Sequence, residues 1–450
     1  MSSKKNLIIY LICNLMEVEK KVNRRKFIKN STTLTIGGVL LSTLPGQLYA
    51  NVSGKEVLKV GLVGCGGRGS GAIFQVLKAS PSVRVVAIGD TFKDRVDKLH
   101  ERIEIKYKDQ SDITEATKFV GFDAYKKVIE ICDVVLLATP PPFRPTHFEA
   151  SIKANKHTFM EKPLAVDVPG YKKIIEIGKL AEKKNLNVVV GLQNRYSTPV
   201  LEMVKRINNG EIGKITSINT YYNVTAPTII PREPQQTEME YQIRNWRYFT
   251  WLWGGQLAGQ AIHQIDAMNM LMNDYPISAL GNGGRLVFNG VNQGNTYDHF
   301  FIEYEYKNGI QMHSQCRNMV NTTNRSGWEV RGSKGIANER FQFKDYNGNT
   351  FWNYRNNDEV GAYQKEQNVF INSILKGTRI NNTEYAAKST LTAIMGRMTA
   401  ETGKKITMDK LLSSKVNIVP EDISWNSKSV LFPDKYGNYK IIKPGIKLLK

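Results

Sequence analysis

The residues 58–69, LKVGLVGCGGRG, decide the fold of this chain. The run Leu58–Val63 is almost continuously apolar, which is typical of a strand buried on both faces of a parallel sheet. A G-x-G-x-x-G loop follows it directly, and an apolar-periodic helix is expected over about residues 72–78. Asp90 ends the next expected strand, 21 residues after Gly69, as in a dinucleotide-binding βαβ unit. The stretch therefore predicts a Rossmann-type domain.

Each glycine of the loop has an expected role. Gly64 permits the tight turn, Gly66 lets the backbone approach a pyrophosphate, and Gly69 allows close packing of helix on strand. The N-terminus of the following helix supplies N–H donors and a positive dipole. Asp90 is expected to accept hydrogen bonds from the adenosine ribose and to repel a 2′-phosphate. NAD is therefore expected in preference to NADP, although the nearby Lys93 and Arg95 leave room for NADP.

Strands and helices go on alternating as far as residue 191. Further strands are expected at residues 83–88, 134–138, 157–160 and 188–190, and helices at about 93–107, 146–154 and 168–184. This alternation predicts an α/β fold with a doubly wound parallel sheet.

The pattern changes beyond residue 191. Expected strands at 215–222, 300–306 and 311–317 alternate apolar and polar residues, and helices are expected at about 198–209, 262–272, 364–375 and 386–401. Such strands suit an open, mainly antiparallel sheet with one covered face, in an α+β domain. The predicted organisation is a leader at 1–50, a Rossmann domain at 56–191, a substrate domain at 192–410 and a tail at 411–450.

The leader has the pattern of an export signal. Arg24-Arg25-Lys26-Phe27 precedes an apolar run at residues 34–44, and Ala50 closes the segment. Paired arginines followed by Phe resemble the twin-arginine (Tat) signal, whose machinery exports folded proteins. A bacterial periplasmic or otherwise exported protein is expected, with the Tat machinery as a partner.

Composition narrows the function classes. The chain has 62 Lys+Arg against 41 Asp+Glu, a formal net charge of +21, but the basic residues are scattered and form no nucleic-acid-binding motif. The longest apolar runs are shorter than the ~20 residues that a membrane-spanning helix needs. Four cysteines are too few for a disulfide framework, and no His/Cys cluster has metal-ligand spacing. Neither nucleic-acid binding nor a metal site is expected.

Further motifs carry a family resemblance. After the glycine loop come Thr139-Pro140, His147 and Glu161-Lys162-Pro163. In this order they resemble the Gfo/Idh/MocA family of NAD(P)-dependent oxidoreductases, over about residues 57–410. The resemblance implies a cofactor site formed by Gly64, Gly66, Gly67, Arg68, Gly69, Asp90, Thr139, Pro140, His147, Glu161 and Lys162.

The same resemblance implies the catalytic residues. Lys162 would lie beside the nicotinamide and polarise the reacting oxygen, and its peptide bond to Pro163 would often be cis. Residues 254–266, GGQLAGQAIHQID, resemble a glycine-led helix that commonly carries an Asp and, four residues later, a His. His263 fits the histidine, but position 259 is Gly, so the usual acid is absent. Lys162 and His263 are the expected catalytic pair, with a buried structural histidine as the alternative.

A substrate site is expected beside this helix. Residues 241–253, YQIRNWRYFTWLW, interleave aromatic rings with Arg and Asn, as a carbohydrate site would require, although core packing is an alternative. The expected substrate-binding residues are Arg195, Tyr196, Arg244, Trp246 and Asp266.

The sequence as a whole predicts an exported NAD-dependent oxidoreductase with a tightly held cofactor. Its substrate would be a sugar, polyol or glycoside, and it would form a homo-oligomer through the C-terminal sheet. Two alternatives stay open: a redox-neutral NAD-dependent glycosidase of the same family, and a non-catalytic sugar-binding protein on this fold.

Overall fold

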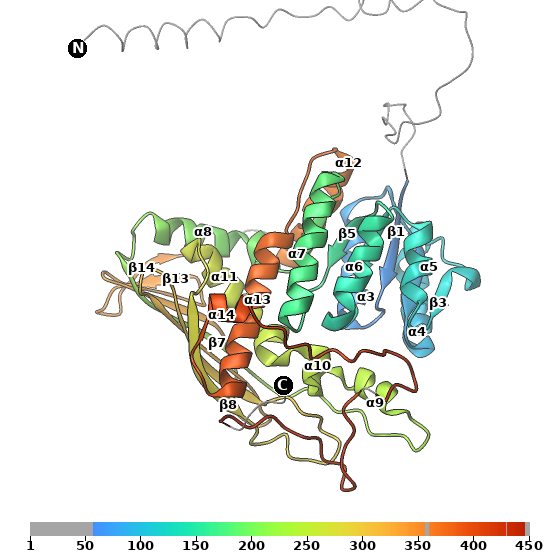
Figure 1. Ribbon diagram of the computed structural model, residues 1–450. Coiled ribbons are helices and arrows are strands. Elements are labelled where there is room, and N and C mark those ends of the chain that lie inside the picture. Colours follow the sequence, from blue (N-terminus) through green and yellow to red (C-terminus); the bar gives the residue numbers. More distant parts are fainter. Residues whose placement is uncertain (1–56, 356–359, 429, 446–450) are drawn as a thin grey trace, which may run out of the picture. The chain divides into compact units, whose positions relative to one another are not determined.

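A six-stranded parallel sheet forms the first half of the chain (Figure 1). The computed structural model describes residues 57–355, 360–428 and 430–445. The strands are β1 (Leu58–Val63), β2 (Val83–Asp90), β3 (Lys118–Val120), β4 (Val134–Leu137), β5 (His157–Met160) and β6 (Val188–Val190). Their order is β3-β2-β1-β4-β5-β6, with every neighbouring pair parallel. This order is that of a dinucleotide-binding Rossmann sheet, so the predicted doubly wound sheet is confirmed.

Helices cover both faces of this sheet. They are α3 (Gly67–Ala79), α4 (Lys93–Tyr107), α5 (Ala124–Ile131), α6 (Arg144–Lys153) and α7 (Val168–Lys183), with short turns η1 (Lys108–Gln110), η2 (Glu115–Thr117) and η3 (Pro141–Phe143). Val60 and Leu62 of β1 pack into one core cluster and Val63 into another, because successive side chains of a strand point to opposite faces. Helix α3 begins at Gly67, five residues earlier than expected, because the glycine loop itself forms the first helical turn.

A nine-stranded sheet forms most of the second half. Its strands are β7 (Ile215–Val224), β8 (Ser278–Gly284), β9 (His299–Glu305), β10 (Gln311–Asn318), β11 (Arg325–Gly332), β12 (Ile336–Asn338), β13 (Gln342–Lys344), β14 (Thr350–Asn353) and β15 (Ile406–Thr407). The order is β14-β13-β12-β11-β7-β10-β9-β8-β15, and only the β7–β10 pairing among these strands is parallel. The prediction of a mainly antiparallel sheet is confirmed. Along β10 buried residues alternate with exposed or half-buried ones, so one face of the sheet packs inward.

Two helices of the second half, α12 (Ala362–Leu375) and α13 (Thr383–Thr402), pack against the Rossmann half. The other helical elements of this half are η4 (Gln193–Tyr196), α8 (Thr198–Asn208), α9 (Glu238–Arg244), η5 (Trp246–Tyr248), α10 (Thr250–Trp253), the π-helical turn η6 (Leu257–Ala261), α11 (Ile262–Met272) and α14 (Met408–Leu412). Helix α12 packs on α3 of the Rossmann half, while α13 contacts both α7 and β8. At the edge of β6, Val188 donates to the Ile380 carbonyl at 2.8 Å. A single boundary after residue 191 therefore does not separate the two halves, since the chain returns to the Rossmann sheet.

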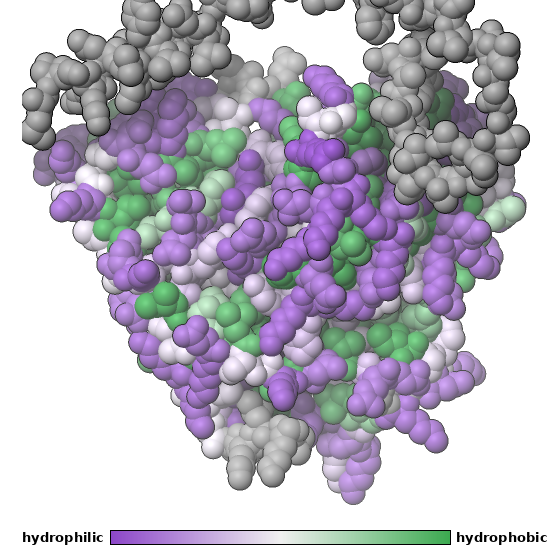
Figure 2. Space-filling view, turned by 45° about the horizontal axis from the view of Figure 1, so that its top comes forward, coloured by the Kyte–Doolittle hydropathy of each residue, from purple (hydrophilic) through white to green (hydrophobic). Residues whose placement is uncertain are grey.

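On the face shown in Figure 2, the surface of the described residues is mainly hydrophilic, and separate hydrophobic clusters interrupt it. Within the described ranges, no helix has both the length and the apolar character needed to cross a membrane. The predicted export signal, with Arg24 and Arg25, lies outside the described residues.

Candidate active site

The glycine loop between β1 and α3 has the shape that a pyrophosphate needs. Gly64 has φ +101°, and a Cβ there would lie 2.7 Å from the Ala138 carbonyl carbon. A Cβ on Gly69 would lie 1.8 Å from the Gly64 oxygen. By contrast, a Cβ on Gly67 would meet nothing within 4 Å, and no side chain caps the start of α3. The outer glycines thus serve packing, while the middle of the loop leaves backbone N–H groups open to an anion.

Asp90 is fixed at the end of β2 by two backbone donors. One carboxylate oxygen accepts from Cys65 N at 2.7 Å, and the other from Phe92 N at 3.0 Å. Burial raises the pKa of Asp90, while Arg95 partly offsets this. Each oxygen keeps a further lone pair for a ribose hydroxyl. The basic residues Arg95, Lys98 and Arg102 line the same end of the cleft, so this end holds cationic side chains as well as the Asp90 carboxylate.

One cleft connects these features. It has a volume of about 560 Å³, which is within the usual range for small-molecule and cofactor sites. On the Rossmann side it is lined by the glycine loop, by Asp90 and by residues at the ends of β4 and β5. On the opposite side it is lined by Ile243, Trp246, Arg247 and Gly259. The residues present therefore fit a dinucleotide, held by the loop and Asp90 at one end.

A buried arginine joins the ends of β4 and β5. Arg144 donates to the carbonyls of Leu137, Thr139 and Pro163 at 3.0, 2.7 and 3.2 Å. His147 contacts the Thr139 hydroxyl at 3.3 Å and stacks on Tyr125, but it does not line the cleft. Burial, and then Arg144, lower the pKa of His147 to about 3, so its ring is neutral. His147, predicted as a cofactor residue, therefore lies outside the cleft and contacts Thr139, which lines it.

Glu161 and Lys162 point in different directions at the end of β5. Glu161 accepts from Arg68 Nε at 3.0 Å and from Arg68 Nη2 at 2.8 Å. Lys162 Nζ instead donates to the Gly259 carbonyl across the cleft at 2.7 Å. Burial lowers the pKa of Lys162 to about 8, opposed by Glu161. The Lys162–Pro163 peptide is cis, as the family resemblance implies. Lys162 is thus an ammonium near neutrality that can lose its proton slightly above it.

The packing of Trp253 explains why position 259 is glycine. A Cβ at position 259 would lie 1.9 Å from Nε1 of Trp253, whose ring is buried. The indole therefore occupies the space that an acid at this position would need. Gly259 also lies in the π-helical turn η6, a type of turn that is frequent at functional sites.

His263 lines a second cavity of about 250 Å³, together with residues from five other segments of the chain. Its Nδ1 is buried without a hydrogen-bond partner among the described residues, as are the amide oxygens of Gln193 and Gln264. Tyr222, Trp328 and Phe341 add aromatic rings to the lining. Burial first, then Lys162 and Arg68, lower the pKa of His263 well below 6.5, so its ring is neutral and can accept a proton.

Two family models match this chain. One is described as an oxidoreductase family with an NAD-binding Rossmann fold and matches residues 58–192. The other, the GFO/IDH/MocA C-terminal domain, matches residues 200–338, so the two together match more than half of the chain. The chain belongs to the Gfo/Idh/MocA family. The predicted family resemblance is confirmed.

Relatives within the Gfo/Idh/MocA family include inositol 2-dehydrogenase of Salmonella typhimurium, which is 28% identical over 222 residues. That match covers 48% of this chain and about half, 55%, of the relative. Aldose–aldose oxidoreductase of Caulobacter crescentus, solved with glycerol, has a TM-score of 0.62 at 16% identity and covers 78% of this chain and 99% of its own. GenD2 from gentamicin A biosynthesis, solved with NAD, has a TM-score of 0.61 at 16% identity, covering 80% and 99%. The solved structures establish the shared fold.

Two of the predicted substrate residues bind each other instead. Arg195 Nη2 donates to Asp266 at 2.9 Å, Ser389 donates to the same oxygen at 2.8 Å, and Asp266 has no exposed surface. Arg195 also stacks on Tyr385, at 3.8 Å from the ring centre. The assignment of Arg195 and Asp266 to substrate contact is corrected, because their charges neutralise each other in the interior. In this Gfo/Idh/MocA member the pair joins η4 to α11 and α13.

The remaining predicted residues divide between structural and cleft positions. The Tyr196 hydroxyl donates to Asn382 at 2.7 Å, away from both cavities. Arg244 pairs with Asp94 at 3.3 Å and lies 3.9 Å over the Phe92 ring, so it supports the cleft from outside. Trp246 lines the cofactor cleft, and its contact with a substrate stays a prediction.

Sequence reasoning missed several residues of the site. Arg144 was missed because a cation near the start of a helix is ordinarily exposed, although the preceding Pro-Pro-Pro-Phe run at a strand end was a signal. Tyr363 stacks under Arg68 at 4.4 Å and lines the second cavity, far along the chain from both motifs. Among the described residues no group of three or more His, Cys, Asp or Glu side chains is placed to hold a metal, and Cys65, Cys132 and Cys316 are buried and free.

Proposed function

We propose that this chain is an exported NAD-dependent oxidoreductase that oxidises a hydroxyl group of a sugar, polyol or glycoside. The observation that carries the proposal is the pairing of Lys162, in the cofactor cleft, with a neutral His263 whose Nδ1 has no partner among the described residues. Lys162 lines the cleft and His263 lines the second cavity. The charge of Lys162 helps to lower the pKa of His263, so a hydrogen-bond donor and a proton acceptor from the two halves of the chain lie near each other. The inositol dehydrogenase relatives have names consistent with this substrate class.

The nicotinamide, when bound, supplies the acceptor for a hydride. The chain's own residues do the rest. The backbone of the glycine loop and the start of α3 hold the pyrophosphate, and Asp90 holds the ribose. His263 takes the proton of the substrate hydroxyl, because burial keeps its ring neutral. The Lys162 ammonium keeps one N–H on the Gly259 carbonyl and offers another to the same hydroxyl oxygen.

The second cavity supports a polyhydroxylated substrate. Two amide oxygens, from Gln193 and Gln264, are buried there without hydrogen-bond partners among the described residues. A buried acceptor without a partner costs free energy, so a ligand that donates to both is favoured. Aromatic rings in the same lining suit the C–H faces of a sugar or cyclitol ring. Hydroxyls and a C–H face occur together in carbohydrates and polyols.

Export is part of the proposal and rests on the sequence of the leader, in particular Arg24 and Arg25. We predict that Arg24→Lys with Arg25→Lys retains the protein in the cytoplasm, because a receptor reads the paired guanidinium groups. Fractionation of a reporter fusion measures this, with Lys20→Arg as the control that leaves export unchanged. Unchanged export of the double variant would show that another signal operates.

The catalytic proposal is tested by denaturing the purified protein and measuring released NAD(H) by absorbance and mass, then screening sugars, inositols and aryl glycosides. Net reduction of NAD by a polyol or sugar supports the oxidoreductase. Cleavage of an aryl glycoside without net change in NAD(H) would replace it by the redox-neutral glycosidase. Bound cofactor without hydride transfer to any compound would leave a binding protein.

A further inference from the structure

The C-terminal segment 413–445 packs closely although it contains no helix or strand among its described residues. Val430 and Tyr439 are buried, in a hydrophobic cluster with Phe92 of the Rossmann half and with residues of α9 and α10. In Figure 1 this segment, in dark red, runs beside α9 and α10. We call it the strap, and we call residues 238–253, which comprise α9, η5 and α10, the wall.

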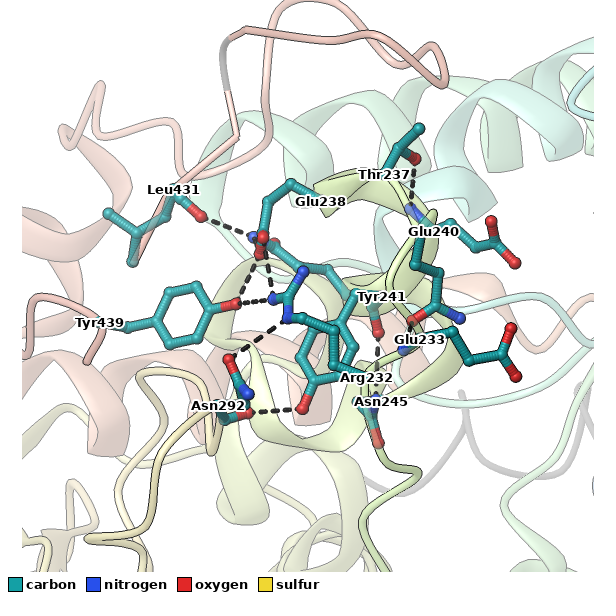
Figure 3. A network of polar contacts seen from close by, with 12 residues as sticks. Arg232, Glu233, Thr237, Glu238, Glu240, Tyr241, Asn245, Asn292, Leu431 and Tyr439 are labelled. Carbon is teal, nitrogen blue, oxygen red and sulfur yellow. Dashed lines mark hydrogen bonds and ion pairs between the residues drawn. The ribbon is translucent and has the colours of Figure 1, made fainter. Parts of the chain in front are cut away.

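Hydrogen bonds attach the strap to the wall (Figure 3). The Tyr439 hydroxyl donates to Glu238 at 2.6 Å and accepts from Arg232 at 2.8 Å. Gln242 donates to the Leu431 carbonyl at 2.6 Å and accepts from the Trp251 indole at 2.6 Å. Bonds to charged partners such as Glu238 and Arg232 are stronger than neutral ones. The strap therefore fixes the start of α9 and, through Gln242, reaches α10.

The other side of the wall forms part of the cofactor cleft. Ile243, Trp246 and Arg247 line the cleft and lie within about five residues of Gln242 in the chain. Arg244 connects the wall to Asp94 of the Rossmann half, which also lines the cleft. Movement of the wall away from the Rossmann domain would therefore open the cleft, and the contacts with the strap oppose that movement.

The strap also contacts the Rossmann half itself. The Trp425 ring lies 5.9 Å from the Phe92 ring and 4.7 Å from the Phe122 ring. Phe92 in turn donates its backbone N–H to Asp90, the expected ribose ligand. Ile418 N donates to the Asp167 carboxylate at 3.1 Å. The strap thus joins both sides of the cleft, the wall through Tyr439 and the Rossmann domain through Trp425.

We propose that the strap retains the bound nicotinamide cofactor, by holding the wall against the Rossmann domain so that the cofactor is released slowly between turnovers. This inference rests on the proposed function, because it requires a cofactor in the cleft. A cofactor that leaves only when the wall moves must wait for the contacts of Tyr439 and Trp425 to break. Weakening either contact should speed release without altering the groups that face the substrate.

The test measures the release of NADH from the full chain by stopped-flow fluorescence, with excess NAD as the competitor. Tyr439→Phe removes the hydroxyl and keeps the ring, and Trp425→Ala removes the contact with the Rossmann domain. Tyr436→Phe is the matched control, since Tyr436 belongs to the strap but is exposed. Tyr439→Phe is expected to speed release roughly tenfold, the equivalent of one to two hydrogen bonds. Trp425→Ala is expected to speed release through loss of the ring contacts with Phe92 and Phe122, and Tyr436→Phe to leave it unchanged.

The outcomes separate the strap from the proposed function. If wild type binds neither NADH nor NADPH, the proposed function fails and the strap has nothing to retain. If wild type binds and both strap variants release NADH at the wild-type rate, the strap proposal alone is overturned. Release accelerated equally by Tyr436→Phe would also overturn it. Thermal unfolding of each variant without cofactor shows whether the substitution also destabilises the protein. Tyr439→Phe keeps the buried ring, so this variant is expected to fold even if Trp425→Ala does not.

Discussion

The cofactor cleft and the second cavity are built in opposite ways. On its Rossmann side the cleft uses backbone geometry encoded in short motifs: a glycine loop, a helix start and the ends of successive strands. The second cavity instead collects residues from η4, β7, α11, β11, the loop between β12 and β13, and α12. Backbone recognition requires only local sequence, while recognition by side chains requires the whole tertiary structure. The cofactor loop can therefore be recognised from one short stretch of sequence, whereas the lining of the second cavity cannot.

The proposed proton transfer between the two halves is tested most severely by Lys162→Met and His263→Ala. Each should reduce turnover by about 10²–10⁴-fold, the usual contribution of a positioned acid or base, while cofactor binding is retained. The double variant should lose less than the product of the two effects, because both residues serve one proton transfer. Steady-state kinetics on the best substrate measures this.

The matched control for this pair is His313→Ala, since His313 lies on β10 outside both cavities and its loss should leave turnover unchanged. Wild-type turnover in both Lys162→Met and His263→Ala would place the chemistry elsewhere in the cleft.

The pH dependence distinguishes the residues of the two halves. Because the pKa of Lys162 is lowered to about 8, its ammonium is present below that pH and is lost above it. Oxidation should therefore slow by about tenfold per pH unit above pH ~8, since the rate follows the protonated fraction. Because the pKa of His263 lies well below 6.5, the rate should not fall as the pH drops from 8 to 6.5.

Initial rates across pH measure this profile. Lys162→Arg keeps a cation and should lose the decline near pH 8, whatever its absolute rate. A decline that persists in that variant would assign the titration to another group.

Gly259 should also show a steric coupling to a neighbouring side chain that Gly67 of the cofactor loop lacks. Gly259→Ala would place a Cβ 1.9 Å from the Trp253 indole, so the free energy of unfolding should fall by about 1–3 kcal/mol, as for overpacked cores. Trp253→Phe should relieve part of that loss, so the double variant should be more stable than the sum of the single effects predicts. Urea unfolding measures all three.

Gly67→Ala is the control, since its Cβ would meet nothing within 4 Å; its unfolding free energy should not fall. Additive effects of Gly259→Ala and Trp253→Phe would show that the indole does not determine the residue at 259.

Sequence analysis predicted the doubly wound parallel sheet and the mainly antiparallel sheet, because these depend on local periodicity. It also named Gly64, Asp90 and Lys162, which line one cleft, because they lie at strand ends. It misassigned Asp266, because a carboxylate on a helix face reads as a ligand until its partner Arg195 is placed beside it. It could not foresee why position 259 is glycine, since the cause is the packing of Trp253. The packing of the strap could not be predicted from the sequence either, because its contacts with α9 join residues about 200 positions apart.

Cofactor choice gives the smallest expected effect and tests the cofactor half. NADH should bind more tightly than NADPH, on the order of fivefold, since two like charges about 4 Å apart in water repel by about 1 kcal/mol. Asp90→Asn should reduce this preference, and Asp94→Asn, which also faces the cleft but pairs with Arg244, should not. Fluorescence titration with both cofactors measures it. Equal or tighter binding of NADPH would assign the ribose end to Arg95, Lys98 and Arg102 instead.

The central claim is that a hydride passes between a polyhydroxylated substrate and the nicotinamide in a site formed by Lys162 and His263. The most direct measurement mixes the NAD-loaded protein with the best substrate deuterated at the reacting carbon, then determines by mass spectrometry whether the nicotinamide has gained deuterium within one turnover. The account predicts deuterium in the nicotinamide of wild type and a large loss of it in Lys162→Met. Bound cofactor that gains no deuterium from any sugar, polyol or glycoside would contradict it.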